Sequence, residues 1–113
     1  MTELELLIAA RANIARGHTK SAVARDHRGR AVDSGSPEAV CFCIIGAFRA
    51  AEQGEGNNCS IDEIPAVQKF AAHAGIPPFF GSLAMFNDTE TTTQAMILEA
   101  FDKAIEQCKR ETP

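Results

Sequence analysis

The stretch of sequence that decides the fold is Val40–Phe48, which reads VCFCIIGAF. It is apolar almost throughout, and apolar residues continue at helical spacing to about residue 51. The preceding Ser36-Pro37-Glu38 combines a capping serine, a proline suited to the first helical position and an acid in the first turn. The sequence therefore predicts a helix that begins at Ser36. Because it is apolar nearly all round, we expect it to form the buried centre of the fold.

Helical patterns and one turn signal lie around this central helix. Two short β-prone runs, residues 21–25 and 30–33, flank the turn at residues 26–29 and predict a β-hairpin. Capping boxes begin at Thr2 and Ser60. A loop is expected over 53–58, and the other main helices are predicted over 3–16, about 60–74 and about 91–110. Residues 79–86 could add a short helix. We expect a single mostly α domain, residues 1–113, built as a compact bundle of about four helices with one small hairpin after the first.

Composition and charge restrict the classes of function. The net charge of −4 argues against a general nucleic-acid binder. No apolar run approaches the roughly 18–20 residues of a membrane helix, and the acidic start Met1–Glu5 does not resemble a signal peptide. We therefore expect a cytoplasmic protein without a membrane partner, in which the four cysteines are reduced thiols.

A metal site is not expected from the cysteines. Only Cys41 and Cys43 form a close pair, whereas structural zinc sites usually use two pairs. Two positions apart on a helix, their side chains would point to different faces. The sequence therefore predicts neither a metal nor a cofactor.

A thiol-dependent hydrolase is one alternative. Cys43, His73 and then Asn87 or Asp88 follow the order of nucleophile, base and orienting group that some thiol hydrolases use. On the predicted helix, Cys43 would lie about two turns from the N-terminus, where the helix dipole lowers a thiol pKa less. The competing interpretation is that Cys43 is a core residue and His73 a solvated helix end.

A basic turn is a second alternative site. Arg25, Arg28 and Arg30 surround the turn, and residues 1–36 carry six basic against four acidic side chains. Such a turn could bind an anion, a nucleotide or an acidic partner, although it lacks the glycine-rich pattern of a phosphate loop. The simpler interpretation is a solvated hairpin.

Two further features concern packing and contact. Asp88 or Thr91 fits the cap of the last helix, and Asn87 tolerates turn conformations. Pro77-Pro78-Phe79-Phe80 is hard to bury in a small core, so Phe79 and Phe80 are candidates for an exposed contact patch. Core packing of either phenylalanine is the rival interpretation.

The same motifs resemble a family of small uncharacterised bacterial and phage proteins, a domain of unknown function. In that family a helix ends in Gly-Trp, an Asp-x-x-Gly-Arg turn follows, and Trp-Cys-x-x-Gly-Ala-Leu and Trp-Asn-Asp come later. Every one of those tryptophans is replaced here. The corresponding segments of this chain are Gly17-His18, residues 26–30, Phe42–Phe48 and Phe86-Asn87-Asp88.

The resemblance implies that Cys43-x-x-Gly46 and Asn87-Asp88 belong to one structural constellation, in which Gly46 allows the close approach of a neighbouring helix and Asn87-Asp88 cap that helix. It makes an accessory or counter-defence role in a phage or mobile element conceivable. Our leading hypothesis is a non-catalytic protein that acts by protein–protein interaction, as a homo-oligomer. The alternatives are the hydrolase and the anion or nucleotide binder.

Overall fold

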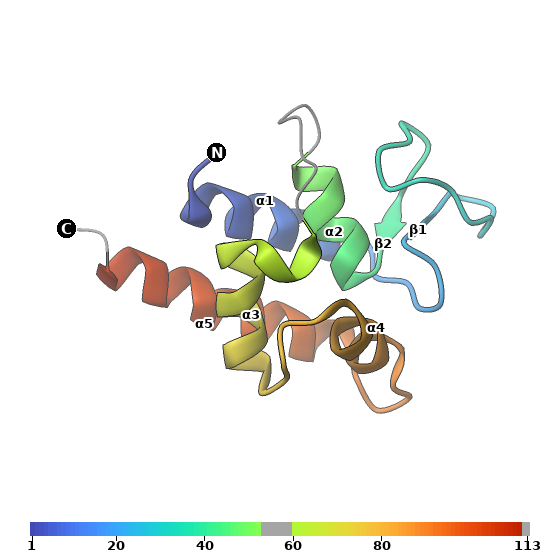
Figure 1. Ribbon diagram of the computed structural model, residues 1–113. Coiled ribbons are helices and arrows are strands. Elements are labelled where there is room, and N and C mark those ends of the chain that lie inside the picture. Colours follow the sequence, from blue (N-terminus) through green and yellow to red (C-terminus); the bar gives the residue numbers. More distant parts are fainter. Residues whose placement is uncertain (53–59, 112–113) are drawn as a thin grey trace.

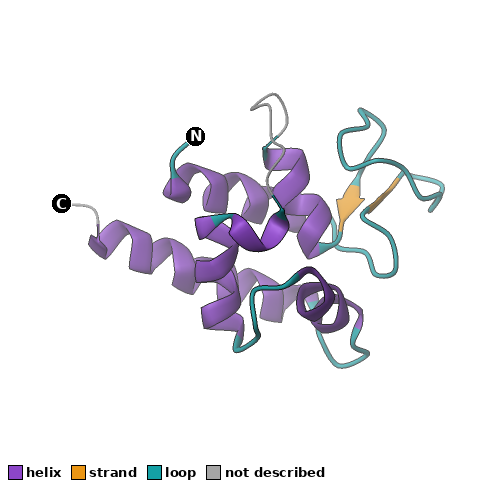
Figure 2. Cartoon of the chain, in the orientation of Figure 1, coloured by secondary structure: helices purple, strands orange, loops and turns teal. Residues whose placement is uncertain are grey.

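The two longest helices, α1 (Glu3–Arg16) and α5 (Gln94–Glu111), pack against each other, and the shorter elements lie on and beside them (Figure 1, Figure 2). The computed structural model describes residues 1–52 and 60–111, so the loop expected over 53–58 lies outside the described residues. In chain order the elements are α1 (Glu3–Arg16), β1 (Ala24–Arg25), β2 (Cys41–Phe42), α2 (Ile44–Ala51), the 3-10 helix η1 (Ile61–Glu63), α3 (Pro65–Ala74), α4 (Phe80–Asp88) and α5 (Gln94–Glu111). The mostly helical class is confirmed, with five α-helices in the described ranges instead of about four.

Three phenylalanines form the centre of the core. Phe48 of α2, Phe70 of α3 and Phe101 of α5 are fully buried, and their ring centroids lie 4.5–6.0 Å apart. Edge-to-face and tilted contacts of this kind stabilise a core beyond the area that they bury. Because the chain has no Trp and no Tyr, these rings supply the large aromatic packing. α1 closes the core by packing against both α2 and α5.

The small sheet exists, but its second strand differs from the prediction. β1 pairs antiparallel with β2, so that Ala24 faces Phe42 and Arg25 faces Cys41. The predicted partner, residues 30–33, contributes only an isolated bridge from Ala31 to Arg25. Phe42 is buried whereas residues 30–33 are mostly exposed, so pairing β1 with β2 removes more apolar surface from water.

The central helix begins at Ile44, and the predicted start at Ser36 is wrong. Ser36 Oγ does accept a hydrogen bond from the amide of Glu38 (3.1 Å), but this closes a single turn. The following backbone is extended, because the Cys43 amide donates to the Val23 carbonyl (3.1 Å) beside β1. The local capping signal was overridden by a partner distant in sequence.

The start of α3 also differs from its capping signal. The capping box predicted at Ser60 lies before the 3-10 helix η1, and the Ser60 side chain makes no capping hydrogen bond there. α3 begins at Pro65, which occupies the first helical position, where its missing N–H costs nothing. Gly75 ends α3 in the left-handed conformation, as a helix-stop glycine usually does.

Candidate functional site

Asn87, near the end of α4, is 1% exposed, and both the oxygen and the nitrogen of its side-chain amide make hydrogen bonds. Its Oδ1 accepts from the Ile44 amide of α2 (3.0 Å) and lies 2.9 Å from His18 Nε2. Its Nδ2 donates to the Thr19 carbonyl (3.1 Å) and to Asp88 Oδ1 (2.9 Å). These four contacts join the segment after α1, the start of α2 and the end of α4.

The Asn87 contacts also determine the tautomer of His18. Oδ1 can only accept, and the donors from Nδ2 fix the orientation of the amide. His18 Nε2 must therefore carry a proton and donate it to Asn87. Sequence reasoning did not select His18 as a site residue. The one sequence feature that pointed to His18 was its place in Gly17-His18, where the similar family has Gly-Trp.

Cys43 lies at the N-cap of α2, not two turns inside a helix as predicted. Its Sγ accepts a hydrogen bond from the Gly46 amide (3.2 Å), and the residue is 7% exposed. Burial raises the pKa of the Cys43 thiol, and the nearby negative charge of Asp88 adds to this against the opposing Gly46 amide. The thiol therefore stays protonated at neutral pH and acts as a weak helix cap, whereas a nucleophile needs the thiolate.

We expect alkylation of folded protein to show this protection. Cys43 should react with iodoacetamide at neutral pH at least about 100-fold more slowly than after unfolding, because the buried thiol reacts only through opening of the structure. Peptide mapping by mass spectrometry gives the rate at each cysteine, and the less buried Cys41 serves as the internal control. Labelling of Cys43 at the rate of a free thiol would contradict the inert interpretation.

The backbone of Val23 lies so close to Gly46 that no side chain has room at this position. A Cβ atom at this position would lie 1.9 Å from the carbonyl oxygen of Val23. The same carbonyl accepts the hydrogen bond from the Cys43 amide (3.1 Å). The first turn of α2 therefore sits directly on the backbone next to β1, a separation that only glycine permits.

Asp88 connects α4 to the segment after α1. Its Oδ1 accepts from the Ser21 amide (2.9 Å), and Ser21 has a positive φ of 65°. Burial raises the pKa of Asp88, but the bonds from Asn87 and Ser21 and the charges of Lys20 and His18 outweigh it, and the pKa is lowered. The carboxylate is therefore ionised at neutral pH.

The predicted capping of α5 by Asp88 or Thr91 is wrong. Asp88 is the last residue of α4, and its carboxylate bonds to the segment after α1. Thr93 supplies the cap instead, since its Oγ1 accepts from the Met96 amide (3.2 Å). Sequence spacing could not separate these neighbouring cap residues, because all of them suit a helix start.

The hydrogen bond that the described residues give His73 is made to α5, not to Cys43 or Asp88. His73 Nε2 is 2.6 Å from Gln107 Oε1, a contact between α3 and α5. In the described part of the chain, no hydrogen bond joins His73 to Cys43 or to Asp88. The histidine that reaches the Asn87-Asp88 pair is His18.

The basic turn is organised by Asp26, which is 3% exposed. The amides of Arg28 and Arg30 and the Arg30 guanidinium all donate to its carboxylate, each at 2.9 Å. The Arg30 amide is the largest cause of a lowered Asp26 pKa, and these bonds together outweigh burial. Arg25 is also engaged, because its guanidinium donates to Thr19 Oγ1 and to two backbone carbonyls. The third arginine, Arg28, is exposed. Within the described residues its backbone amide makes a hydrogen bond but its side chain makes none.

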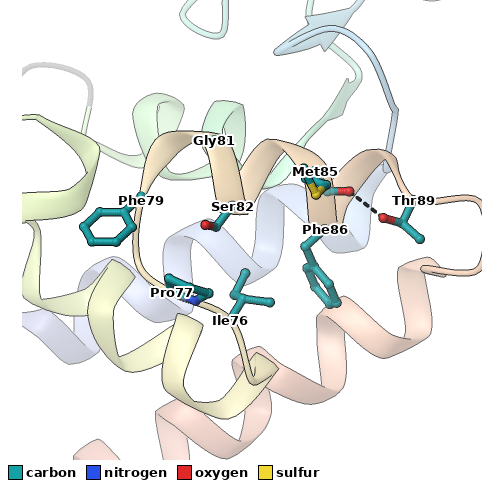
Figure 3. Close-up of a pocket in the computed structure, with 8 residues that line it drawn as sticks. All are labelled: Ile76, Pro77, Phe79, Gly81, Ser82, Met85, Phe86 and Thr89. Carbon is teal, nitrogen blue, oxygen red and sulfur yellow. Dashed lines mark hydrogen bonds between the residues drawn. The ribbon is translucent and has the colours of Figure 1, made fainter.

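An apolar surface covers α4 and the segment before it, and we call it the α4 surface (Pro77, Phe79, Phe80, Gly81, Ser82 and Met85). Phe79, Phe80 and Met85 are 57%, 58% and 74% exposed. A groove of about 550 Å³ runs along this surface, with Ser82, Met85 and Phe86 of α4 on one side and Ile76 and Pro77 of the preceding segment on the other (Figure 3).

No metal or membrane element is found in the described ranges. No group of three His, Cys, Asp or Glu side chains within 1–52 and 60–111 could hold a metal ion. In the same ranges, no helix combines the length and apolarity needed to cross a bilayer.

A family model described as a family of unknown function (DUF6197) matches residues 1–107. The chain belongs to DUF6197. The match covers nearly the whole chain, including α1, the turn, α2 and the Asn87-Asp88 pair. No curated protein and no solved structure matches this DUF6197 member. A function for the DUF6197 chain must therefore be argued from its own surface.

Proposed function

We propose that this protein is non-catalytic and acts by binding another protein through the α4 surface. The observation that carries the proposal is the exposure of Phe79 and Met85 in the lining of one groove, with the exposed Phe80 next to Phe79 in the chain. Isolated exposed apolar residues are common, but a cluster of large ones around a concave surface is typical of an interaction site.

The charge pattern supports the same proposal. Residues 74–87 contain no charged side chain, although 23% of the chain is charged. Interface centres are depleted of charge and enriched in Phe and Met, which describes this segment. The Asn87 contacts hold the C-terminal end of α4, so the surface is attached to the core by directional bonds.

The alternative functions have weaker support. A hydrolase using Cys43, His73 and Asp88 needs an accessible thiolate, whereas Cys43 is buried with a raised pKa. An anion site at the turn has weaker support because Arg25 and Arg30 already bond within the turn, which leaves Arg28 as the one of the three without a side-chain bond to the described residues. An accessory or counter-defence role remains a prediction, and the gene neighbourhood would test it.

Site-specific crosslinking tests the interaction. A photoreactive residue is placed at Met85, and in a matched variant at Met96, which is also exposed but lies on α5. After irradiation in producing cells, adducts should form at Met85 only, and mass spectrometry identifies the partner. The purified partner should then bind Met85→Glu at least about tenfold more weakly than Met96→Glu, as expected for a central apolar anchor. Absence of adducts, or equal adducts at both positions, would overturn the proposal.

A further inference from the structure

We infer that the partner at the α4 surface is a second copy of the chain, and that the two α4 helices pack antiparallel across a two-fold axis. The inference rests on the proposed function and specifies its partner. Three features support it: a knob and a hollow on one face of α4, the absence of charge in residues 74–87, and the direction of the helix.

Gly81 and Met85 provide the hollow and the knob. They are one helical turn apart, so they share a face of α4. Beyond its chain neighbours and the local helix backbone, a Cβ atom at Gly81 would have no atom of the described residues within 4 Å, whereas Met85 is 74% exposed. In an antiparallel pair centred between them, Met85 of each copy covers Gly81 of the other. A two-fold interface needs this self-complementarity, because the same surface acts on both sides.

The lack of charge allows identical copies to meet. Two copies of one surface present like charges to each other wherever the surface is charged. The segment 74–87 has none, so no like-charge repulsion arises at the centre of the contact. Flexible methionine and small neighbours such as Ser82 also permit close packing of two helices.

The ends of α4 favour the antiparallel direction. Phe79, its N-cap, makes no side-chain hydrogen bond, so the positive end of the helix dipole is not neutralised by a cap. Asp88 ends α4, and Glu90 follows two residues later. Lys20 donates to the Thr89 carbonyl (2.5 Å), and its positive charge partly offsets the negative charge of Asp88. Antiparallel packing brings the remaining negative charge near the uncapped end of the other copy.

The contact is small, which sets the expected affinity. α4 has 9 residues, and with the preceding segment it forms an interface at the low end of the specific range. We therefore expect a reversible dimer with a dissociation constant of about 10–100 μM. Sedimentation equilibrium of the purified full chain, from well below to well above this range, should show a monomer–dimer transition.

Gly81→Gln is the decisive variant. Its Cβ enters open space and Gly81 has no positive φ, so glutamine, a better helix former, should leave the monomer at least as stable. The side chain fills the hollow that Met85 of the other copy would occupy. We expect dimerisation to weaken at least about tenfold in Gly81→Gln and Met85→Glu, as for interface anchors, and to be unchanged in Met96→Glu.

The outcomes separate this inference from the proposed function. A strict monomer at every concentration, or a dimer that Gly81→Gln leaves intact, overturns the antiparallel α4 dimer. If the chain is monomeric but Met85 crosslinks to a different identified protein, the proposed function stands and the dimer inference fails. A monomer without adducts at Met85 overturns both.

Discussion

Replacing Gly46 by alanine should destabilise the protein by at least about 3 kcal/mol, near the upper end of single-substitution effects. The added Cβ would lie 1.9 Å from the Val23 oxygen and 2.7 Å from the Val23 carbonyl carbon. Both are backbone atoms, so no side-chain rotation can relieve the clash. Moving the Val23 carbonyl away would break its hydrogen bond with the Cys43 amide. Urea unfolding followed by circular dichroism measures the loss.

Gly81→Ala is the matched control for Gly46→Ala. Both glycines lie in helices, but outside the local helix a Cβ at Gly81 meets no atom of the described residues within 4 Å. Without a clash, only helix propensity changes, so Gly81→Ala should stabilise the fold by about 0.5–1 kcal/mol. Equal effects at the two positions would show that α2 does not lie against Val23.

Gly46 also shows how far the sequence could predict this site. The glycine was expected to allow a close approach, and the resemblance grouped it with Asn87-Asp88. Its contact was expected to be another helix, whereas it is the backbone before β1. The difference follows from the false helix start at Ser36: local capping chemistry is visible in sequence, but the pairing of β2 with β1 is a distant contact.

The boundaries of α1 were predictable because its signals are local and consistent. Thr2 and Glu5 form the expected capping box, and Gly17 follows the last residue. The role of His18 was not predictable, since its bond to Asn87 joins residues 69 positions apart. The side-chain network of the site depends on such distant pairs, which periodicity and capping patterns do not contain.

Asn87→Ala should cost about 3 kcal/mol and act first on α4. The change leaves the Ile44 amide and the Thr19 carbonyl without their partners at a buried position. Asn13→Ala is the matched control, because Asn13 is only partly buried and its side chain makes one hydrogen bond within the described residues, to the Ala47 carbonyl (3.0 Å). It should cost about 1 kcal/mol.

Hydrogen exchange distinguishes a loss of anchoring from a general loss of stability. If Asn87 holds α4 on the core, the amides of residues 80–88 should lose protection in Asn87→Ala before those of α1 and α5 do. A uniform loss across all helices, or a cost no larger than that of Asn13→Ala, would contradict this role.

Asn87→Asp tests the donors of the same amide separately. The acceptor for Ile44 and His18 is kept, but an oxygen replaces Nδ2 and faces the Thr19 carbonyl and the Asp88 carboxylate. Burial and the like charge should raise the pKa of the new carboxyl in the folded state. Because a raised folded-state pKa means that folding takes up a proton, the variant should be less stable at pH 7 than at pH 5 relative to the parent chain. Protonation of the new carboxyl restores a hydrogen-bond donor toward Asp88. Lowering the pH should therefore recover part of the lost stability in Asn87→Asp but not in Asn87→Ala. Only a requirement for a donor at this position produces that contrast.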